Sequence, residues 1–290
     1  MYTILTDSCS DLNAQIAARF AQLEVLPLSY TISGQTSTQP FDDAARCSAF
    51  YDRLRAGEMC TTSQVSQGDF AEAFKAHAKK GEAVLGLIFS SALSGTYASA
   101  CMARDMVLEE YPDAVIELVD TLSASAGEGM VVYDALLRRD AGMPIEENAV
   151  YTKAHLQEYA HWFTVDDLHF LKRGGRCSPS AAFFGTMLKI KPVLHVDSEG
   201  RLIARSKVRG RVQALRAIAM KFGELEADKD QVIFISHGDC EKDALLVKDT
   251  LVKTFGCAPE KIFLSAVGPV IGSHSGPGTV ALFFRGKNRG

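Results

Sequence analysis

Three short turns in this 290-residue chain are rich in hydroxyl side chains, which can hold a small anion. They cover residues 6–10 (TDSCS), 61–63 (TTS) and 90–96 (SSALSGT). The third turn connects an apolar strand pattern at 83–89 to a helical pattern that begins near Tyr97. Ser94 and Gly95 lie at the end of this turn, just before the helix. The first N–H groups of a helix lack partners and its dipole favours negative charge, so this turn is suited to an anion. The competing interpretation is that Ser94 only caps the helix.

The second hydroxyl-rich turn contains two side chains that helix capping does not use. Ser66 and Asp69 have the spacing of a capping box, with Ser66 as the N-cap of a helix that continues to about Lys80. Thr62 and Ser63 come before this box, and we expect them to remain available for a ligand.

A histidine follows much later, within the glycine-rich segment 267–278 (VGPVIGSHSGPG), and glycine and proline in this number predict a shaped loop. If His274 meets the hydroxyl-rich turns in a cleft, the group could bind a carboxylate or phosphate. The alternative is a hydrolase or another enzyme that uses Ser94 and His274 on an anionic substrate, with Asp7 or Asp120 completing a triad. Ser94 lacks the G-x-S-x-G context of a nucleophile elbow, so we favour binding.

The elements that must position these residues alternate between strands and helices. Strand, small-residue turn and helix follow one another at 83–100 and again at 114–137, which predicts parallel βαβ units in an α/β fold. A strand at 25–32 contains Pro27, which indicates an edge or a bulge. The break at 140–144 (DAGMP) predicts a domain boundary, giving an N-terminal domain over 1–145 and a C-terminal domain over 146–290 with a β-hairpin near 190–208.

Composition narrows the class of protein. Apolar residues make up 47% of the chain and the net charge is −4, which is typical of a globular protein and argues against a nucleic-acid partner. The apolar runs are too short for a membrane span, and seven scattered cysteines suit a reducing compartment, so we expect a cytoplasmic protein. Asp166, Asp167 and His169 lack a second histidine at ligand spacing, and nucleotide-binding glycine motifs are absent. We therefore expect no metal and no cofactor.

Seven motifs, in order along nearly the whole chain, resemble the DegV family. They are TDSCSDL (6–12), TSQVSQGDF (62–70), SSALSGTYASA (90–100), VDTLSASAGEGM (119–130), LKRGGR (171–176), KIKPVLHVDSEG (189–200) and VGPVIGSHSGPG (267–278). The second motif departs from the family's usual TSQPSPGEF, because Val65 and Gln67 replace both prolines. This departure leaves the Thr62 hydroxyl in place but loosens the loop that follows it.

The resemblance implies a two-domain fold in which each domain has a mainly parallel sheet flanked by helices, with a ligand tunnel at the domain interface. It implies a bacterial protein that binds a long-chain fatty acid and presents the carboxylate to a separate ATP-dependent fatty acid kinase subunit. This protein then carries the acyl phosphate for phospholipid synthesis and has no catalytic residues of its own.

Carried over by motif, the carboxylate would be held by Thr62, Ser94, Gly95 and His274. Arg173, Arg209 and Ser63 are further candidates for contact with the carboxylate or with the kinase. The apolar faces at 70–74 and 183–188 suit either the acyl tunnel or the plain core.

Overall fold

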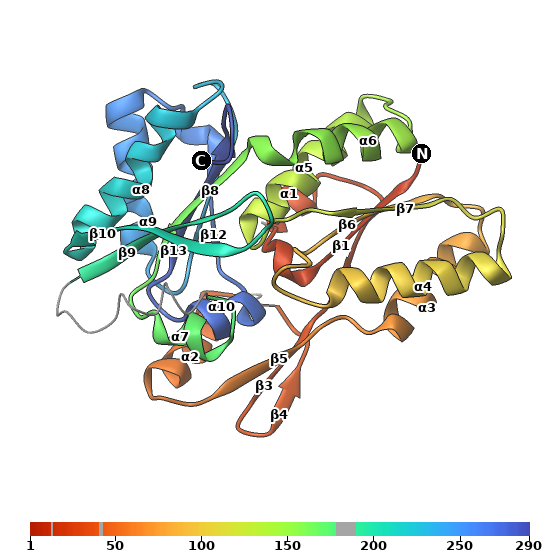
Figure 1. Cartoon of the computed structure of the whole chain (residues 1–290), viewed down its shortest axis with the longest axis horizontal. Coiled ribbons are helices and arrows are strands. Elements are labelled where there is room, and N and C mark those ends of the chain that lie inside the picture. Colours follow the sequence, from red (N-terminus) through yellow and green to blue (C-terminus); the bar gives the residue numbers. More distant parts are fainter. Residues whose placement is uncertain (13, 41–42, 178–189) are drawn as a thin grey trace.

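The computed structural model describes residues 1–12, 14–40, 43–177 and 190–290 (Figure 1). It contains a four-stranded sheet, a six-stranded sheet and a small three-stranded sheet, here called the first, second and small sheets. The expected α/β class is confirmed. In the described part of the chain, no helix combines the length and apolar character needed to cross a bilayer.

The first sheet is parallel throughout, in the order β2-β1-β6-β7. Its strands are β1 (Thr3–Asp7), β2 (Leu23–Leu26), β6 (Val84–Ile88) and β7 (Ile116–Asp120). Helices α3 (Gln67–Ala78) and α4 (Thr96–Glu110) cover one face, and α5 (Ala126–Asp140) and α6 (Ile145–His155) cover the other (Figure 1). Every residue of β6 is buried because helices pack on both faces of this sheet.

The second sheet has the order β10-β9-β8-β13-β11-β12. Its strands are β8 (Tyr159–Thr164), β9 (Ile190–Val196), β10 (Leu202–Arg209), β11 (Ile233–His237), β12 (Ile262–Ala266) and β13 (Val280–Arg285). Helices α8 (Arg211–Leu225) and α9 (Glu241–Thr250) join these strands.

The expectation of a mainly parallel sheet in both halves is wrong for this second sheet. Among its described strands, only β11 and β12 pair in parallel, while the other four pairings are antiparallel. The last strand, β13, inserts between β8 and β11 and runs opposite to both. A buried apolar strand has the same sequence pattern in either direction, so strand and helix alternation could not specify this topology.

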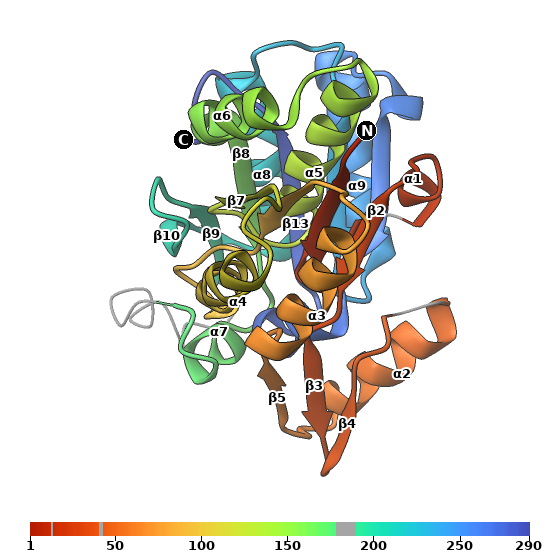
Figure 2. The same cartoon turned by 90° about the vertical axis from the view of Figure 1, so that its right-hand side faces the viewer.

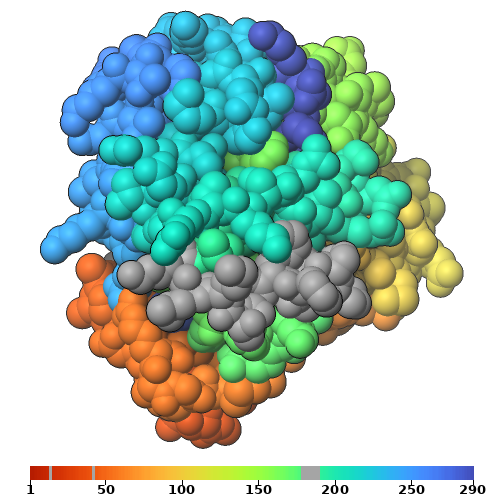
Figure 3. Space-filling view, turned by 60° about the vertical axis from the view of Figure 1, so that its left-hand side comes forward, coloured from red at the N-terminus to blue at the C-terminus, as the bar shows by residue number. Residues whose placement is uncertain are grey.

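The predicted hairpin near 190–208 is present as β9 and β10, which pair antiparallel. Figure 3 shows this segment, in teal, running across the outer face of the molecule. Its turn contacts the first sheet's loops, because the Ser90 hydroxyl donates to the Gly200 carbonyl (3.0 Å). The hairpin thereby connects the edge of the second sheet to the hydroxyl-rich turn that follows β6.

The small sheet was not predicted. It consists of β3 (Ser29–Ile32), β4 (Gln35–Ser37) and β5 (Cys60–Ser63), and it lies next to α2 (Ala44–Arg55), as Figure 2 shows at the lower end of the molecule. The single strand expected at 25–32 is divided at Pro27 and Leu28 into β2 and β3, which belong to different sheets. Proline cannot donate to a sheet ladder, which explains why β2 ends at the residue before Pro27.

Seven short helices lie in the segments between these strands and longer helices of the described chain. They are η1 (Ser8–Ser10), α1 (Ala14–Ala17), η2 (Leu156–Glu158), α7 (His169–Arg173), η4 (Leu251–Phe255), η5 (Pro259–Lys261) and α10 (Pro269–Ser275). The capping box of α3 is confirmed, with Ser66 and Asp69 bonded reciprocally.

Helix α5 lies between the two large sheets (Figure 1). One hydrophobic cluster includes Leu85 and Leu87 of β6, Val131 of α5, and Phe163 and Phe283 of the second sheet. The apolar core is therefore continuous across both halves of the chain. The division at 145/146 stays a proposal.

Candidate functional site

A cavity of about 340 Å³ lies where the loops of the first sheet, the small sheet and the second sheet meet. This volume falls within the range of small-molecule sites in proteins. Most of its wall is apolar, and leucine, valine and phenylalanine side chains from β8, β9, β13 and α10 contribute to it. Its polar lining includes five of the predicted residues, namely Thr62, Ser63, Ser94, Gly95 and His274.

Thr62 and His274 form a pair at this cavity, although 212 residues separate them in the chain. Thr62 Oγ1 lies 2.7 Å from His274 Nε2. Thr62 belongs to β5 of the small sheet, and His274 belongs to the last turn of α10. The glycine-rich segment expected to be a loop contains this helix, which begins at Pro269, a residue well suited to a first helical position.

The imidazole of His274 is uncharged at neutral pH. Burial, followed by the positive charges of Arg176 and Arg173, lowers its pKa to about 4. A neutral imidazole has one N–H donor and one acceptor nitrogen. Nε2, the nitrogen that faces Thr62, either donates to the hydroxyl or accepts from it, depending on the tautomer. When Nε2 carries the proton it donates to Thr62 Oγ1, and the Thr62 hydroxyl can then donate to an anionic ligand. The pair thus offers a donor without adding a buried positive charge.

Ser94 and Gly95 bring the N-terminus of α4 to the cavity wall. Gly95 is the N-cap residue, and Ser94 precedes it. The Ser94 hydroxyl accepts a hydrogen bond from the Thr96 N–H (3.2 Å) and lies 2.8 Å from the Thr96 hydroxyl. The expectation that Ser94 caps the helix is therefore wrong, because the N-cap is Gly95 and its position carries no side-chain cap bond. The Ser94 hydroxyl instead closes a local turn before α4, and the positive end of the α4 dipole lies at the same wall.

Among the described residues, no hydrogen bond joins Ser94 to His274 or His274 to either acid, as a catalytic triad needs. His274 pairs with Thr62, and the two acids considered for a triad hold backbone N–H groups. Asp7 accepts from Cys9 and Phe89, and Asp120 accepts from Ser91 and Leu122. The geometry therefore favours binding over nucleophilic catalysis.

The arginines of the LKRGGR motif lie in different positions. Arg176 lines the cavity, and its Nε donates to the Leu93 carbonyl (3.0 Å). Arg173 is exposed, with its guanidinium 4.8 Å from the centre of the Phe170 ring, and Arg209 is exposed at the end of β10. Neither of these two is part of the cavity lining. The LKRGGR motif includes Arg176, but sequence reasoning did not select this arginine as a site residue.

Sequence reasoning also missed polar residues on the inner wall, namely Ser125, His161 and Ser236. Ser125 is the N-cap residue of α5, whereas His161 and Ser236 lie on β8 and β11. His161 and Ser236 are polar residues within otherwise apolar strands, and this pattern could have identified them in the sequence. Of the two apolar faces left open, Phe70 and Phe74 stack in the core (5.7 Å between ring centres), and residues 183–188 lie outside the described residues.

Other polar groups considered in the sequence have structural partners. Asp166 forms ion pairs with Lys191 (2.7 Å) and Arg211 (3.6 Å), and Asp167 pairs with His169 (2.8 Å). These contacts fit a solvated, ion-paired turn.

Fold and site together define an α/β protein with a largely apolar cavity and a polar, donor-rich wall. The sequence model of the DegV family matches residues 1–287, and the chain belongs to this family. A DegV domain-containing protein of Clostridium perfringens is 40% identical over 293 residues, covering 99% of this chain and 98% of the relative.

Two solved structures share this fold over their whole length. A DegV family protein of Thermus thermophilus, described as fatty-acid binding, has a TM-score of 0.87 at 32% identity, with 98% of this chain and 99% of that chain covered. A fatty-acid-binding DegV family protein of Streptococcus agalactiae has a TM-score of 0.83 at 29% identity, with 99% of each chain covered.

Proposed function

We propose that this protein binds a long-chain fatty acid, with the acyl chain in the apolar part of the cavity and the carboxylate at the Thr62–His274 pair. The observation that carries the proposal is the position of this pair on the wall of a largely apolar cavity, together with Ser94 and Gly95 at the start of α4. Family members described as fatty-acid binding, with the same fold, support it.

The energetics of such a ligand suit this cavity. Each buried methylene contributes about 0.8 kcal/mol, so a long chain supplies most of the affinity. A buried carboxylate without donors would cost several kcal/mol. The donors we assign to it are the hydroxyls of Thr62 and Ser94 and the backbone N–H of Gly95, with the His274 imidazole holding the Thr62 hydroxyl in place. An amphipathic ligand with a single anionic end matches both parts of the site.

We further propose that a separate ATP-dependent kinase subunit phosphorylates the bound carboxylate, and that this protein then carries the acyl phosphate toward phospholipid synthesis. The chain would contribute no catalytic residue of its own. Arg173 and Arg209 are exposed and could meet an acidic surface of the kinase. All seven cysteines are free thiols, which supports a cytoplasmic location for this pair of proteins.

Binding is tested by extracting lipid from the purified protein for mass spectrometry and by titrating the emptied protein with fatty acid. We expect a copurified fatty acid and a saturable binding curve. A protein that carries no lipid and takes up none would refute the proposal.

The head-group assignment is tested with Thr62→Val, which keeps the shape of the side chain and removes its hydroxyl. Loss of a hydrogen bond to a charged group costs about 1.5–3 kcal/mol, so Kd should rise about 10-fold or more. Thr61→Val is the matched control, because Thr61 is the preceding residue of β5 and does not line the cavity. Equal affinities for the two variants would show that the carboxylate binds elsewhere.

The kinase step has its own test, which is acyl-phosphate formation when the loaded protein is mixed with a fatty acid kinase subunit and ATP. We expect product only when both proteins are present. Normal fatty acid binding without any product would refute the kinase partnership and leave the binding proposal intact.

A further inference from the structure

The cavity contains a second polar group, separate from the Thr62–His274 pair. It consists of Ser125, His161 and Ser236, here called the His161 subsite, and all three side chains line the cavity. Their exposed fractions are 5%, 1% and 0%, respectively. An acyl chain cannot form hydrogen bonds with polar side chains on the cavity wall. Buried polar atoms that lack a hydrogen-bond partner are destabilising, so these side chains suggest a ligand with a further polar group.

His161 is the residue of this group that most needs a partner. It lies on β8 opposite Phe283 of β13, and its ring meets the Phe283 ring edge-on with 5.5 Å between centres. The backbone of Gly127 lies close by, because a Cβ there would come within 2.3 Å of Nε2. Within the described residues, neither ring nitrogen of His161 makes a hydrogen bond of normal length and angle, and its polar neighbour is the backbone of Gly127.

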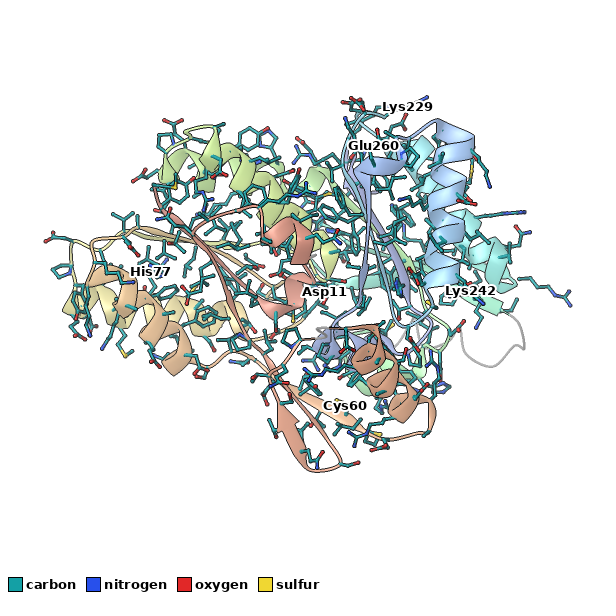
Figure 4. The ribbon with its side chains drawn as sticks, turned by 180° about the vertical axis from the view of Figure 1, so that it is seen from behind. Asp11, Cys60, His77, Lys229, Lys242 and Glu260 are labelled. Atoms are coloured by element: carbon teal, nitrogen blue, oxygen red, sulfur yellow. The ribbon has the colours of Figure 1, made fainter. Side chains whose placement is uncertain are left out.

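The two serines of the subsite form a chain of hydroxyl groups. Ser125 Oγ lies 3.0 Å from Ser236 Oγ and donates to the Asp11 carboxyl group at 2.5 Å. Asp11 lies near the middle of the molecule, where the two large sheets approach each other (Figure 4). The same carboxyl group accepts from the Gly268 N–H (2.8 Å), immediately before α10.

The chemistry of the subsite excludes some ligand groups and favours one. Burial and the charge of Arg289 push the pKa of His161 well below its usual range, so the ring is neutral and offers both a donor and an acceptor. A second carboxylate is disfavoured here, because Asp11 already lies behind Ser125. A bare methylene would leave the imidazole with no polar contact besides the Gly127 backbone. A hydroxyl group both donates and accepts, and it matches this surface.

We propose that the His161 subsite binds a hydroxyl group carried on the acyl chain, so that the protein prefers hydroxylated long-chain fatty acids to unsubstituted ones. This inference rests on the proposed fatty-acid binding and adds the substrate class. The alternative occupant of the subsite is ordered water, which fills polar cavities in many proteins.

The test compares stearic acid with a series of monohydroxystearic acids that carry the hydroxyl at successive positions from mid-chain to tail. For wild-type protein we expect at least one isomer to bind about 10-fold more tightly than stearic acid, the effect of one well-formed buried hydrogen bond. His161→Phe should abolish this preference, so that this variant binds stearic acid and every monohydroxystearic acid with similar affinity.

His195→Phe is the matched control. His195 is also buried, with 2% of its surface exposed, and its ring nitrogens likewise make no hydrogen bond within the described residues. It lies on β9 on the opposite face of the second sheet, stacked 5.0 Å from the Trp162 ring, and is not part of the cavity lining. The preference for the hydroxylated acid should survive this substitution.

The outcomes are distinct for the two proposals. Stearic acid binding without preference for any isomer would mean that water alone occupies the subsite, and it would overturn this inference only. A preference that persists in His161→Phe would overturn it as well. If no acid binds at all, the proposed function fails and this inference fails with it.

A second measurement is independent of whether the variants fold. In a crystal structure of the wild-type protein with the preferred isomer, the ligand hydroxyl should lie about 3 Å from a His161 ring nitrogen. A hydroxyl that faces the apolar wall instead would overturn the inference.

Discussion

Replacement of Gly174 with alanine tests whether the Thr62–His274 pair holds the ligand. Gly174 ends α7 with ordinary helical angles (φ −72°, ψ −10°), so alanine adds only a methyl group. Its carbon would lie 2.2 Å from His274 Nδ1. Non-bonded atoms pack at about 3.5 Å, so the ring must move by about 1.3 Å. Nε2 is already 2.7 Å from Thr62 Oγ1, which prevents movement toward Thr62 and forces the ring out of the pair.

The expected result is a large loss of fatty acid affinity with little change in folding. A hydrogen bond to a charged carboxylate contributes about 1.5–3 kcal/mol, so Kd should rise about 10- to 150-fold. The assay is titration of the emptied protein with stearic acid, combined with urea unfolding of the same preparation.

Gly175→Ala provides the matched control at the neighbouring position. Gly175 has a left-handed backbone (φ +70°), and a Cβ there would meet open space. We expect this variant to lose about 1 kcal/mol of unfolding free energy because of backbone strain and to keep its affinity. If Gly174→Ala binds stearic acid as tightly as the wild type does, the Thr62–His274 pair does not hold the carboxylate.

Two further predictions concern charge. Arg176→Ala should weaken fatty acid binding several-fold, because it removes a cavity-lining cation that also donates to the Leu93 carbonyl. Arg173→Ala is the control and should bind fatty acid normally. Equal losses of affinity for the two variants in a titration would contradict this prediction. Burial raises the pKa of Asp11 to about 7. The stability that protonated Asp11 contributes is therefore complete below about pH 4 and is lost as the pH rises through about 7. Between these two pH values, the urea midpoint of Asp11→Asn should fall less than that of the wild type. The same pH slope in both proteins would show that Asp11 does not titrate this way.

Local sequence patterns were sufficient for much of the first sheet and its helices. The reason is that buried strands such as β6 and caps such as Ser66 with Asp69 depend on neighbours along the chain. The hydroxyl-rich turns could also be found because capping accounted for Ser66 but not for Thr62. The motifs that resemble the DegV family were enough to place Thr62, Ser94 and His274 in one group.

Local sequence patterns could not predict the contacts between residues far apart in the chain. The direction of β13 depends on which strands it joins, and an apolar strand has the same sequence pattern in either direction. The division of 25–32 at Pro27 depends on a second sheet being available to receive β3. In the LKRGGR motif, the sequence alone does not say which arginine side chain reaches the cavity, and the structure places Arg176 there.

By itself, the sequence determined that this is an α/β protein with hydroxyl-rich turns suited to an anion, because strand, turn and helix signals lie within a few residues of one another. The tertiary structure decided that Thr62 meets His274 across 212 positions, and that His161 faces the cavity while His195 faces away from it. The physical reason is that a side chain's partner depends on which strand lies beside it and which face it occupies, and both are fixed only when the sheets assemble.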